Sequence, residues 1–309
     1  MSKKVLVSIV GPTGIGKTTL AIAVAKYFDT EIVSADSRQF YKEITIGTAV
    51  PSVAELHEVP HHFIQHRSIL EDYSVGDYER DAMKLLRQLF QTHDIVVLVG
   101  GSGLYVDAVT KGLDDFPEID KSIRLGLNEL LQEKGLPVLQ RRLKQLDPDY
   151  YHKVDLENPH RVIRALEVCI GSGRPYSSFL TEKRPNRFFK NLTVGIQAER
   201  EIIYKRIDQR VDAMMRQGLL KEAKALYPQK SLNALQTVGY RELFQYFDGK
   251  CDLDFAVSEI KKNTRRFAKR QLTWYRRRED ILWVAYNQSF DDVLSKIEEQ
   301  ITAFSDERK

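Results

Sequence analysis

The sequence has few cysteines and no long apolar run, and these absences exclude several classes of protein. Its two cysteines, Cys169 and Cys251, lie far apart and form no CxxC pair, so we expect neither a disulfide framework nor a zinc site. No apolar run approaches the roughly 18–20 residues that span a bilayer. No secretory signal precedes the first apolar segment. We therefore expect a cytoplasmic protein without a membrane segment.

The composition is otherwise that of an ordinary globular protein, and its positive charge is concentrated in one segment. The net charge is only +4 over 309 residues. Residues 261–278, however, contain nine Lys or Arg and no acid, interleaved with Phe267, Trp274 and Tyr275. Basic and aromatic side chains together suit a nucleic-acid backbone with stacked bases. A solvated helix face explains the segment equally well.

Short apolar segments alternate with helical patterns in the first third of the chain. Residues 5–10, 31–35 and 95–99 are predicted strands, and 17–27 and 77–91 have helical periodicity. Such alternation is typical of a parallel sheet with right-handed crossovers. Ligands of such sheets bind at the carboxyl ends of the strands, so we expect the segments after these strands to form one site.

The pattern changes after Gly112. Residues 114–190 are polar, helical in pattern and interrupted by prolines, and 192–197 again resembles a strand. We predict that 1–113 and 191–309 form the catalytic core and that 114–190 form an inserted helical domain. Further helical patterns cover 201–228, 231–247, 254–278 and 290–304.

A complete phosphate-binding motif follows the first predicted strand. Its residues match GxxxxGK[ST] in full and precede a helical pattern, the context in which this motif is specific. Glycines allow consecutive backbone N–H groups to turn toward phosphate oxygens. Lys17 adds a positive charge, and the Thr18 hydroxyl is a ligand for Mg²⁺. The motif predicts an α/β fold with a P-loop NTPase-like sheet that binds a phosphorylated substrate with Mg²⁺; its residues are Gly11, Pro12, Thr13, Gly14, Ile15, Gly16, Lys17 and Thr18.

An acid is missing where nucleotide hydrolases usually have one. The predicted strand 95–99 runs into Gly100-Gly101-Ser102-Gly103, which disfavours simple nucleotide hydrolysis. Asp36 instead follows the strand at 31–35. From its position alone, Asp36 could equally accept a proton from a substrate or cap the next helix with its side chain.

Several motifs together resemble the tRNA dimethylallyltransferases, also called tRNA isopentenyltransferases. They occur in the family's order over residues 11 to about 278. Beyond the phosphate loop they include Asp36-Ser37-Arg38-Gln39, Ile46-Gly47-Thr48-Ala49, Gly100–Tyr105, Asn158–Glu167, Gly239–Glu242 and Asn263–Trp274.

The resemblance implies transfer of a dimethylallyl group from dimethylallyl pyrophosphate to N6 of adenosine 37 in tRNA, with release of pyrophosphate. It assigns proton abstraction to Asp36 and places Ser102 near the reacting groups. Lys17 and Thr18 would stabilise the leaving pyrophosphate with Mg²⁺. Arg200 and Arg206 match arginines that bind pyrophosphate, for which a planar guanidinium is suited.

The resemblance also implies contacts with the tRNA anticodon stem-loop, with the target adenine flipped out of its stack. The helical insertion, which contains Arg141, Arg142, Arg174, Arg184 and Arg187, would bind the stem. The expected RNA-contacting residues are Asp36, Ser37, Arg38, Gln39, Ser102, Arg124, His160, Arg161, Val162, Ile163, Arg164, Gln236, Gly239, Tyr240, Arg241, Lys269, Arg270, Gln271, Trp274 and Arg276.

Two other functions compete with this interpretation. A P-loop kinase or a prenyltransferase acting on a free nucleotide would also need the phosphate loop, but not the basic segment 261–278. A non-enzymatic RNA-binding module would not need Lys17, Thr18 or Asp36. We expect a monomer in each case.

Overall fold

The computed structural model describes residues 4–180 and 186–306, and its central feature is a parallel sheet. The strand order is β3-β2-β4-β1-β5-β6, and every neighbouring pair is parallel. The fold is thus the predicted α/β fold. The strands are β1 (Val5–Val10), β2 (Ile32–Ser34), β3 (His61–His62), β4 (Ile95–Val99), β5 (Lys190–Gln197) and β6 (Ile281–Ala285).

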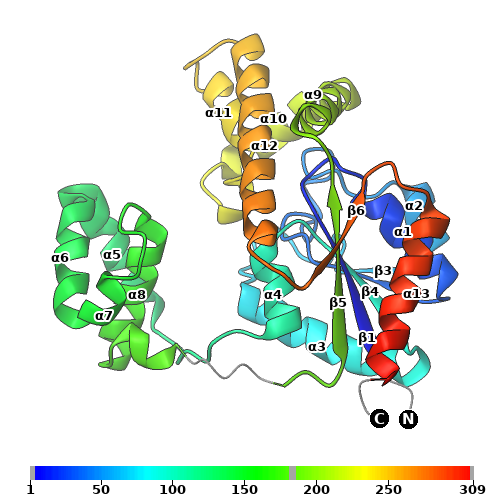
Figure 1. The fold of residues 1–309 in the computed structure, drawn as a ribbon. Coiled ribbons are helices and arrows are strands. Elements are labelled where there is room, and N and C mark those ends of the chain that lie inside the picture. Colours follow the sequence, from blue (N-terminus) through cyan, green and yellow to red (C-terminus); the bar gives the residue numbers. More distant parts are fainter. Residues whose placement is uncertain (1–3, 181–185, 307–309) are drawn as a thin grey trace. The chain divides into compact units, whose positions relative to one another are not determined.

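Strand β1 lies in the middle of the sheet, and its side chains point alternately into two cores. Val7 and Ile9 join the core that contains residues of α1 (Lys17–Tyr27) and α13 (Phe290–Asp306). Leu6 and Val10 join the core on the other face. There they meet α3 (Val75–Thr92) and α4 (Gly103–Lys111). Figure 1 shows these helix pairs on opposite sides of the strands.

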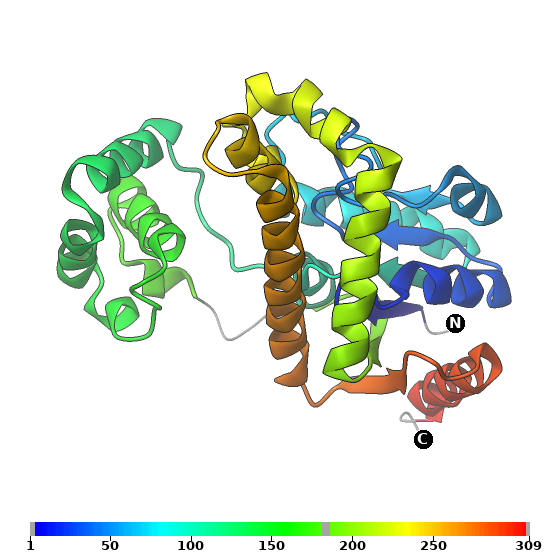
Figure 2. The same ribbon diagram turned by 90° about the horizontal axis from the view of Figure 1, so that it is seen from above.

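Helices α9 to α12 lie beyond the carboxyl ends of the strands, whereas α2 lies beside α1, to which it is joined by an ion pair of 3.0 Å between Glu58 and Lys26 (Figure 1). Ion pairs from Arg265 to Asp208 and from Lys261 to Asp212, each 2.6 Å long, join α12 to α9, and Figure 2 shows the two helices side by side. The elements are α2 (Val53–Glu58), α9 (Arg200–Gln217), α10 (Leu219–Leu226), η2 (Tyr227–Gln229), η3 (Asn233–Leu235), α11 (Tyr240–Phe247) and α12 (Leu253–Arg276).

The predicted helix at 17–27 is confirmed, and those at 77–91, 254–278 and 290–304 are confirmed to within a few residues. The helical pattern 201–228 is interrupted at Gly218, whose φ of 104° is accessible mainly to glycine. The pattern 231–247 is helical from Tyr240 onward but begins with a short 3-10 turn and a loop. Strands β3 and β6 and helix α2 were not predicted, because each is only two to six residues long.

The chain divides into two compact units. The first comprises Met1–Lys111 and Arg187–Lys309, and the second is Gly112–Asn186. Among the described residues of the second unit, all regular secondary structure is helical. Its elements are α5 (Lys121–Lys134), α6 (Leu136–Leu146), α7 (Pro148–Tyr151), α8 (Pro159–Ser172) and η1 (Tyr176–Phe179).

The second unit has its own apolar core, in which Leu139, Leu143 and Leu166 are fully buried. Helix α8 begins at a good N-terminal signal, since the Asn158 side chain accepts from Arg161 N–H and Pro159 stands in the first turn. The unit can therefore hold its shape by its own packing.

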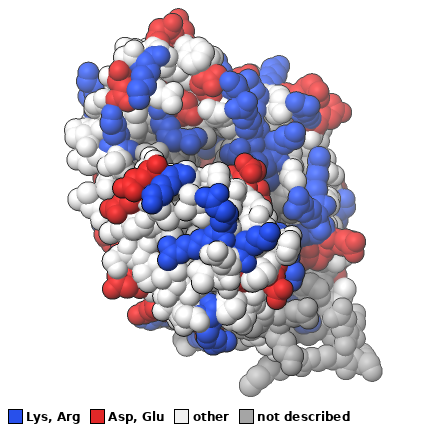
Figure 3. Space-filling view, turned by 90° about the vertical axis from the view of Figure 1, so that its left-hand side faces the viewer, with Lys and Arg blue, Asp and Glu red and all other residues white. Residues whose placement is uncertain are grey.

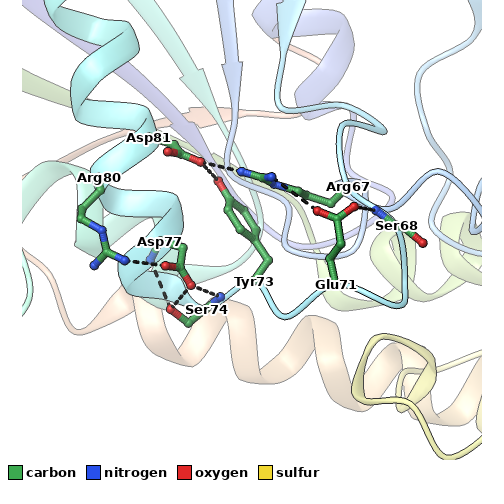
Figure 4. Close-up of polar contacts among 8 residues, drawn as sticks. All are labelled: Arg67, Ser68, Glu71, Tyr73, Ser74, Asp77, Arg80 and Asp81. Carbon is green, nitrogen blue, oxygen red and sulfur yellow. Dashed lines mark hydrogen bonds and ion pairs between the residues drawn. The ribbon is translucent and has the colours of Figure 1, made fainter. Parts of the chain in front are cut away.

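A polar network fixes the loop between β3 and α3, and Figure 4 shows its members. Arg67 Nη2 lies 3.0 Å from Asp81 Oδ2, which also accepts from the Tyr73 hydroxyl at 2.9 Å. Ser74 and Asp77 form a reciprocal capping box at the start of α3. The loop that leads from β3 into α3 is thereby tied to that helix.

No helix in the described part of the chain is both long enough and apolar enough to cross a membrane.

Candidate active site

Two adjoining cavities lie in the first unit, where the segments after β1, β2 and β4 converge as expected. The larger has a volume of about 750 Å³ and contains the phosphate loop. The smaller measures about 420 Å³ and lies against α11 and α12. Six residues line both cavities, so the two are neighbours across a shared wall: Thr13, Asp36, Arg210, Met214, Phe267 and Gln271.

The phosphate loop has the backbone shape that its motif predicts. Gly14 and Gly16 have φ values of 78° and 108°, in the region that favours glycine. A Cβ on Gly11 would lie 2.9 Å from the carbonyl oxygen of Ile196, so this position also requires a close backbone approach. The loop ends at the N-terminus of α1, where the helix dipole favours an anion.

Lys17 and Asp36 lie in the same cavity and interact electrostatically. Lys17 Nζ donates to the carbonyl oxygen of Pro12 at 2.9 Å. Burial lowers the pKa of Lys17 to about 8, while the Asp36 charge acts in the opposite direction. A buried lysine with this pKa gains strongly from a bound polyanion, because a phosphate group replaces the lost hydration.

The sequence left open whether Asp36 caps the next helix or faces a substrate. A turn, not a helix, follows Asp36, and within it Asp36 Oδ1 accepts from Arg38 N–H at 3.0 Å. The same side chain also lines both cavities. A carboxylate has a second oxygen that can take a proton, so the two roles are compatible.

Helix α9 carries Arg200 and Arg206, which were expected to bind pyrophosphate, and also Arg210. The structure places these three arginines differently. Arg206 Nε donates to the carbonyl oxygen of Gly14 at 2.8 Å, so its guanidinium lies on the phosphate loop. Arg200 stacks over Tyr204 and is not among the residues that line either cavity. Arg210 was not singled out from the sequence, yet it lines both cavities.

Arg210 is the most informative addition to the predicted site. Burial lowers the pKa of its guanidinium, and the charge of Asp36 partly offsets this. A half-buried arginine beside a cavity is costly unless an anion balances it. The sequence could have indicated this role, because Arg210 follows the predicted site residue Arg206 by four positions and residues four apart lie on the same face of a helix.

The smaller cavity collects many of the residues expected to contact RNA. Those that line it are Asp36, Ser37, Arg38, Ser102, Gln236, Gly239, Arg241, Arg270 and Gln271. The pKa of Arg270 is lowered by burial and by the nearby charges of Arg241 and Arg266. Such a group of like charges favours a phosphate in its midst.

Not all of the expected RNA contacts agree with the structure. The side chains of Val162 and Ile163 are buried in the core of the second unit, and Tyr240 is fully buried with its hydroxyl donating to Glu222. Apolar positions on the inner faces of α8 and α11 account for their burial. These three side chains face the protein interior, so an RNA contact at these positions stays a prediction that only their backbone atoms could fulfil.

Two further residues of α12 have partners within the protein. The Trp274 indole donates to Asp107 Oδ2 at 3.0 Å and packs on Gly103, where a Cβ would approach the ring to 2.4 Å. Gln271 is buried and bonds to the phosphate loop. Of the α12 residues expected to meet RNA, Lys269, Arg270, Trp274 and Arg276 are exposed on the surface. Gln39 lines the larger cavity.

In the second unit, Arg124 and Arg164 share one acid. Both guanidinium groups lie within 3.2 Å of Glu167 Oε2, whose side chain is 7% exposed. His160 and Arg161 are exposed at the start of α8. Arg187 belongs to the first unit, where it pairs with Glu79 and is not available to a stem, and Arg184 lies outside the described residues.

The loop that contains the Ile46–Ala49 motif depends on a residue that the sequence did not reveal. Glu222 of α10 accepts from three consecutive backbone N–H groups, those of Thr45, Ile46 and Gly47, at 2.9 to 3.0 Å. Residues of this loop line both cavities. The Glu222 carboxylate thus holds this loop, which lines the cavities, in one conformation.

Surface charge in this protein is mixed. Figure 3 shows Lys and Arg side chains in several groups on one face, with Asp and Glu between them.

Comparison with known proteins identifies relatives over most of the chain. Residues 39–278 match the family model described as IPP transferase. A protein of Christiangramia forsetii named tRNA dimethylallyltransferase is 59% identical over 296 residues, covering 96% of this chain and 98% of its own. A protein of the same name from Flavobacterium johnsoniae is 58% identical over 304 residues, with the same coverage.

Solved structures give the same result for the fold. The tRNA isopentenylpyrophosphate transferase of Bacillus halodurans is 35% identical and has a TM-score of 0.71, covering 97% of this chain and 96% of its own. A eukaryotic dimethylallyltransferase acting on tRNA is 25% identical with a TM-score of 0.81, covering 97% of this chain and 80% of its own.

Proposed function

The chain belongs to the IPP transferase family, and we propose that it transfers a dimethylallyl group from dimethylallyl pyrophosphate to N6 of adenosine 37 of tRNA, releasing pyrophosphate. The observation that carries this proposal is the shared wall between the two cavities. Asp36 stands in that wall, with the phosphate loop on one side and the arginines of α11 and α12 on the other. A donor and an acceptor can therefore meet at one carboxylate.

The donor's pyrophosphate occupies the larger cavity in this proposal. The loop amides, Lys17 and Arg206 supply hydrogen bonds and positive charge, and Arg210 adds a second guanidinium from the same helix. These groups stabilise the charge that grows on pyrophosphate as the allylic carbon–oxygen bond breaks. The leaving group takes the electrons of that bond.

The residues around the phosphate loop also fit a magnesium ion. The hydroxyls of Thr18 and Ser34 and the carboxylate of Asp36 line the same cavity, and oxygen atoms are the ligands Mg²⁺ prefers. We assign Thr18 as its protein ligand. A magnesium ion held there would supply further neutralisation of the pyrophosphate charge.

The acceptor adenine enters the smaller cavity and faces Asp36. Its exocyclic amine is a weak nucleophile, so the carbon–oxygen bond of the donor breaks largely before the new carbon–nitrogen bond forms. The amine then loses one proton, which Asp36 accepts. Ser102 lines this cavity and can donate to or accept from the base.

tRNA is the polymer that the proposal requires. An adenine reaches Asp36 only after leaving its stack, which anticodon-loop bases do readily. In this proposal Arg241 and Arg270, which line the smaller cavity, hold backbone phosphates, and the helical second unit contacts the stem. We propose a monomer, acting where tRNA is used, in the cytoplasm.

Labelled dimethylallyl pyrophosphate, Mg²⁺ and unmodified tRNA test the proposal directly. The expected result is label in the RNA, with mass analysis finding the added five-carbon group on one adenosine beside the anticodon. A parallel reaction contains free adenine nucleotide in place of tRNA, and label in that nucleotide but not in tRNA would instead support a small-molecule prenyltransferase. Label in neither would end the proposal.

A further inference from the structure

Gln271 of α12 connects two parts of the active site. It is 7% exposed, although glutamine usually lies at the surface. Its Oε1 accepts from Thr13 N–H at 2.9 Å, and its Nε2 donates to the carbonyl oxygen of Gly101 at 2.9 Å. Both ends of the amide are therefore used, one on the phosphate loop and one on the segment after β4.

The surroundings leave Gln271 little freedom. A Cβ on Gly101 would approach Gln271 Nε2 to 2.3 Å and Lys17 Nζ to 3.4 Å, so glycine is required between them. Gln271 lines both cavities. The amide thus stands beside the lysine that faces the donor, in the wall that separates donor from acceptor.

The side chain also belongs to the helix that carries the basic surface. Arg270 precedes it and lines the smaller cavity, while Phe267 lies one turn earlier and lines both. A polymer that contacts Arg270 therefore contacts the helix residue directly before Gln271, whose side chain is hydrogen-bonded to Thr13. Gln271 is the direct hydrogen-bonded link from α12 to the loop that binds pyrophosphate.

We infer that Gln271 is a positioning residue that holds the phosphate loop in its anion-binding shape and ties that shape to the position of α12. This inference rests on the proposed function for the identity of the acceptor. The loop-holding role itself needs only that the loop binds pyrophosphate. The sequence analysis expected Gln271 to contact RNA; in this inference it acts on the phosphate loop, which binds the donor.

The test measures binding of inorganic pyrophosphate with Mg²⁺ by calorimetry, together with the KM for the donor and the affinity for tRNA. Gln271→Met keeps the length of the side chain but cannot bond to either partner. We expect the pyrophosphate Kd and the donor KM to rise about tenfold or more, because two buried hydrogen bonds are lost. tRNA affinity should change less than about threefold.

A pH profile distinguishes positioning from mere structural support. In Gln271→Glu, the ionised carboxylate can accept from Thr13 N–H but cannot donate to Gly101. Its protonated form can do both. Lowering the pH from about 7 to about 4.5, toward the ordinary glutamate pKa of about 4.3, should therefore improve pyrophosphate binding by this variant relative to wild type, whereas Gln271→Met should show no such relative change.

Ser258→Ala is the matched control. Ser258 is an exposed residue of the same helix, and its hydroxyl donates to the carbonyl oxygen of Phe255. The control should bind pyrophosphate like wild type. If Gln271→Met does not fold, Gly101→Ala offers a second route, because its methyl group displaces the Gln271 amide.

Pyrophosphate affinity within about twofold of wild type in folded Gln271→Met or Gly101→Ala would overturn the inference. So would a Gln271→Glu variant whose binding follows the wild-type pH profile. Since pyrophosphate binding is measured without tRNA, failure of the wild type to modify tRNA would contradict the proposed function and leave this test intact.

Discussion

Lys17 should reduce the stability of the protein without its substrate, and its removal should stabilise the fold. Burial lowers the pKa of Lys17 from 10.5 to about 8. Near pH 7 the lysine is charged in both folded and unfolded protein. The folded state therefore carries the full cost of the buried charge, about 3 kcal/mol at about 1.4 kcal/mol for each pH unit.

Replacing Lys17 with methionine removes this cost and one hydrogen bond, that to Pro12. Loss of this hydrogen bond should destabilise the variant by about 1–2 kcal/mol. Subtracted from the roughly 3 kcal/mol gained by removing the charge, this leaves a net increase of about 1–2 kcal/mol in the free energy of unfolding near pH 7. Urea titrations of both proteins measure the difference. The methionine variant should at the same time lose measurable binding of pyrophosphate.

The pH dependence has a definite sign. Between about pH 8 and about pH 10.5 the unfolded lysine keeps its proton while the folded one loses it, so wild-type stability rises relative to the variant. The advantage of Lys17→Met should thus shrink by about 2 kcal/mol between about pH 7 and about pH 9.5. A variant that is less stable than wild type near pH 7, or a difference independent of pH, would refute the reasoning.

Three further predictions concern the walls of the two cavities. Arg206→Ala, which loses the contact with Gly14, should raise the KM for the donor by about tenfold or more and leave tRNA affinity nearly unchanged; steady-state kinetics at saturating tRNA decide this. Arg270→Ala should lower the slope of log affinity for tRNA against log salt by about one, and an unchanged slope would show that Arg270 holds no phosphate. Glu222→Gln should destabilise the loop after Ile44 by about 1–3 kcal/mol, because an amide cannot replace a carboxylate that accepts from three N–H groups. Amide hydrogen exchange at Thr45 to Gly47 should then be faster than in wild type, and equal exchange rates would contradict this role of Glu222.

Local signals were sufficient to predict the parts of the fold where residues near in sequence act together. The phosphate loop, β1 and α1 follow from a motif and an apolar run within residues 5–27. The convergence of Asp36 with this loop followed from parallel strand order, because carboxyl ends share one edge. Short elements such as β6 and α2 give too few residues for a periodic pattern.

Contacts between distant segments could not be predicted in this way. Gln271 and Tyr240 lie in motifs that also contain basic residues, and only the packing of α11 and α12 shows that their side chains face inward. Glu222 meets residues about 175 positions away in the sequence, and no local pattern indicates such a partner. The role of Arg210 was within reach, since it repeats Arg206 after one turn.

The most direct test of the central claim compares wild type with Asp36→Asn in a single turnover, with labelled donor bound and tRNA in excess. The asparagine keeps an oxygen to accept from Arg38 N–H but cannot take a proton at neutral pH. The account predicts that pyrophosphate and tRNA bind to the variant nearly as to wild type, while transfer to RNA falls by about a thousandfold. Transfer at the wild-type rate would contradict it.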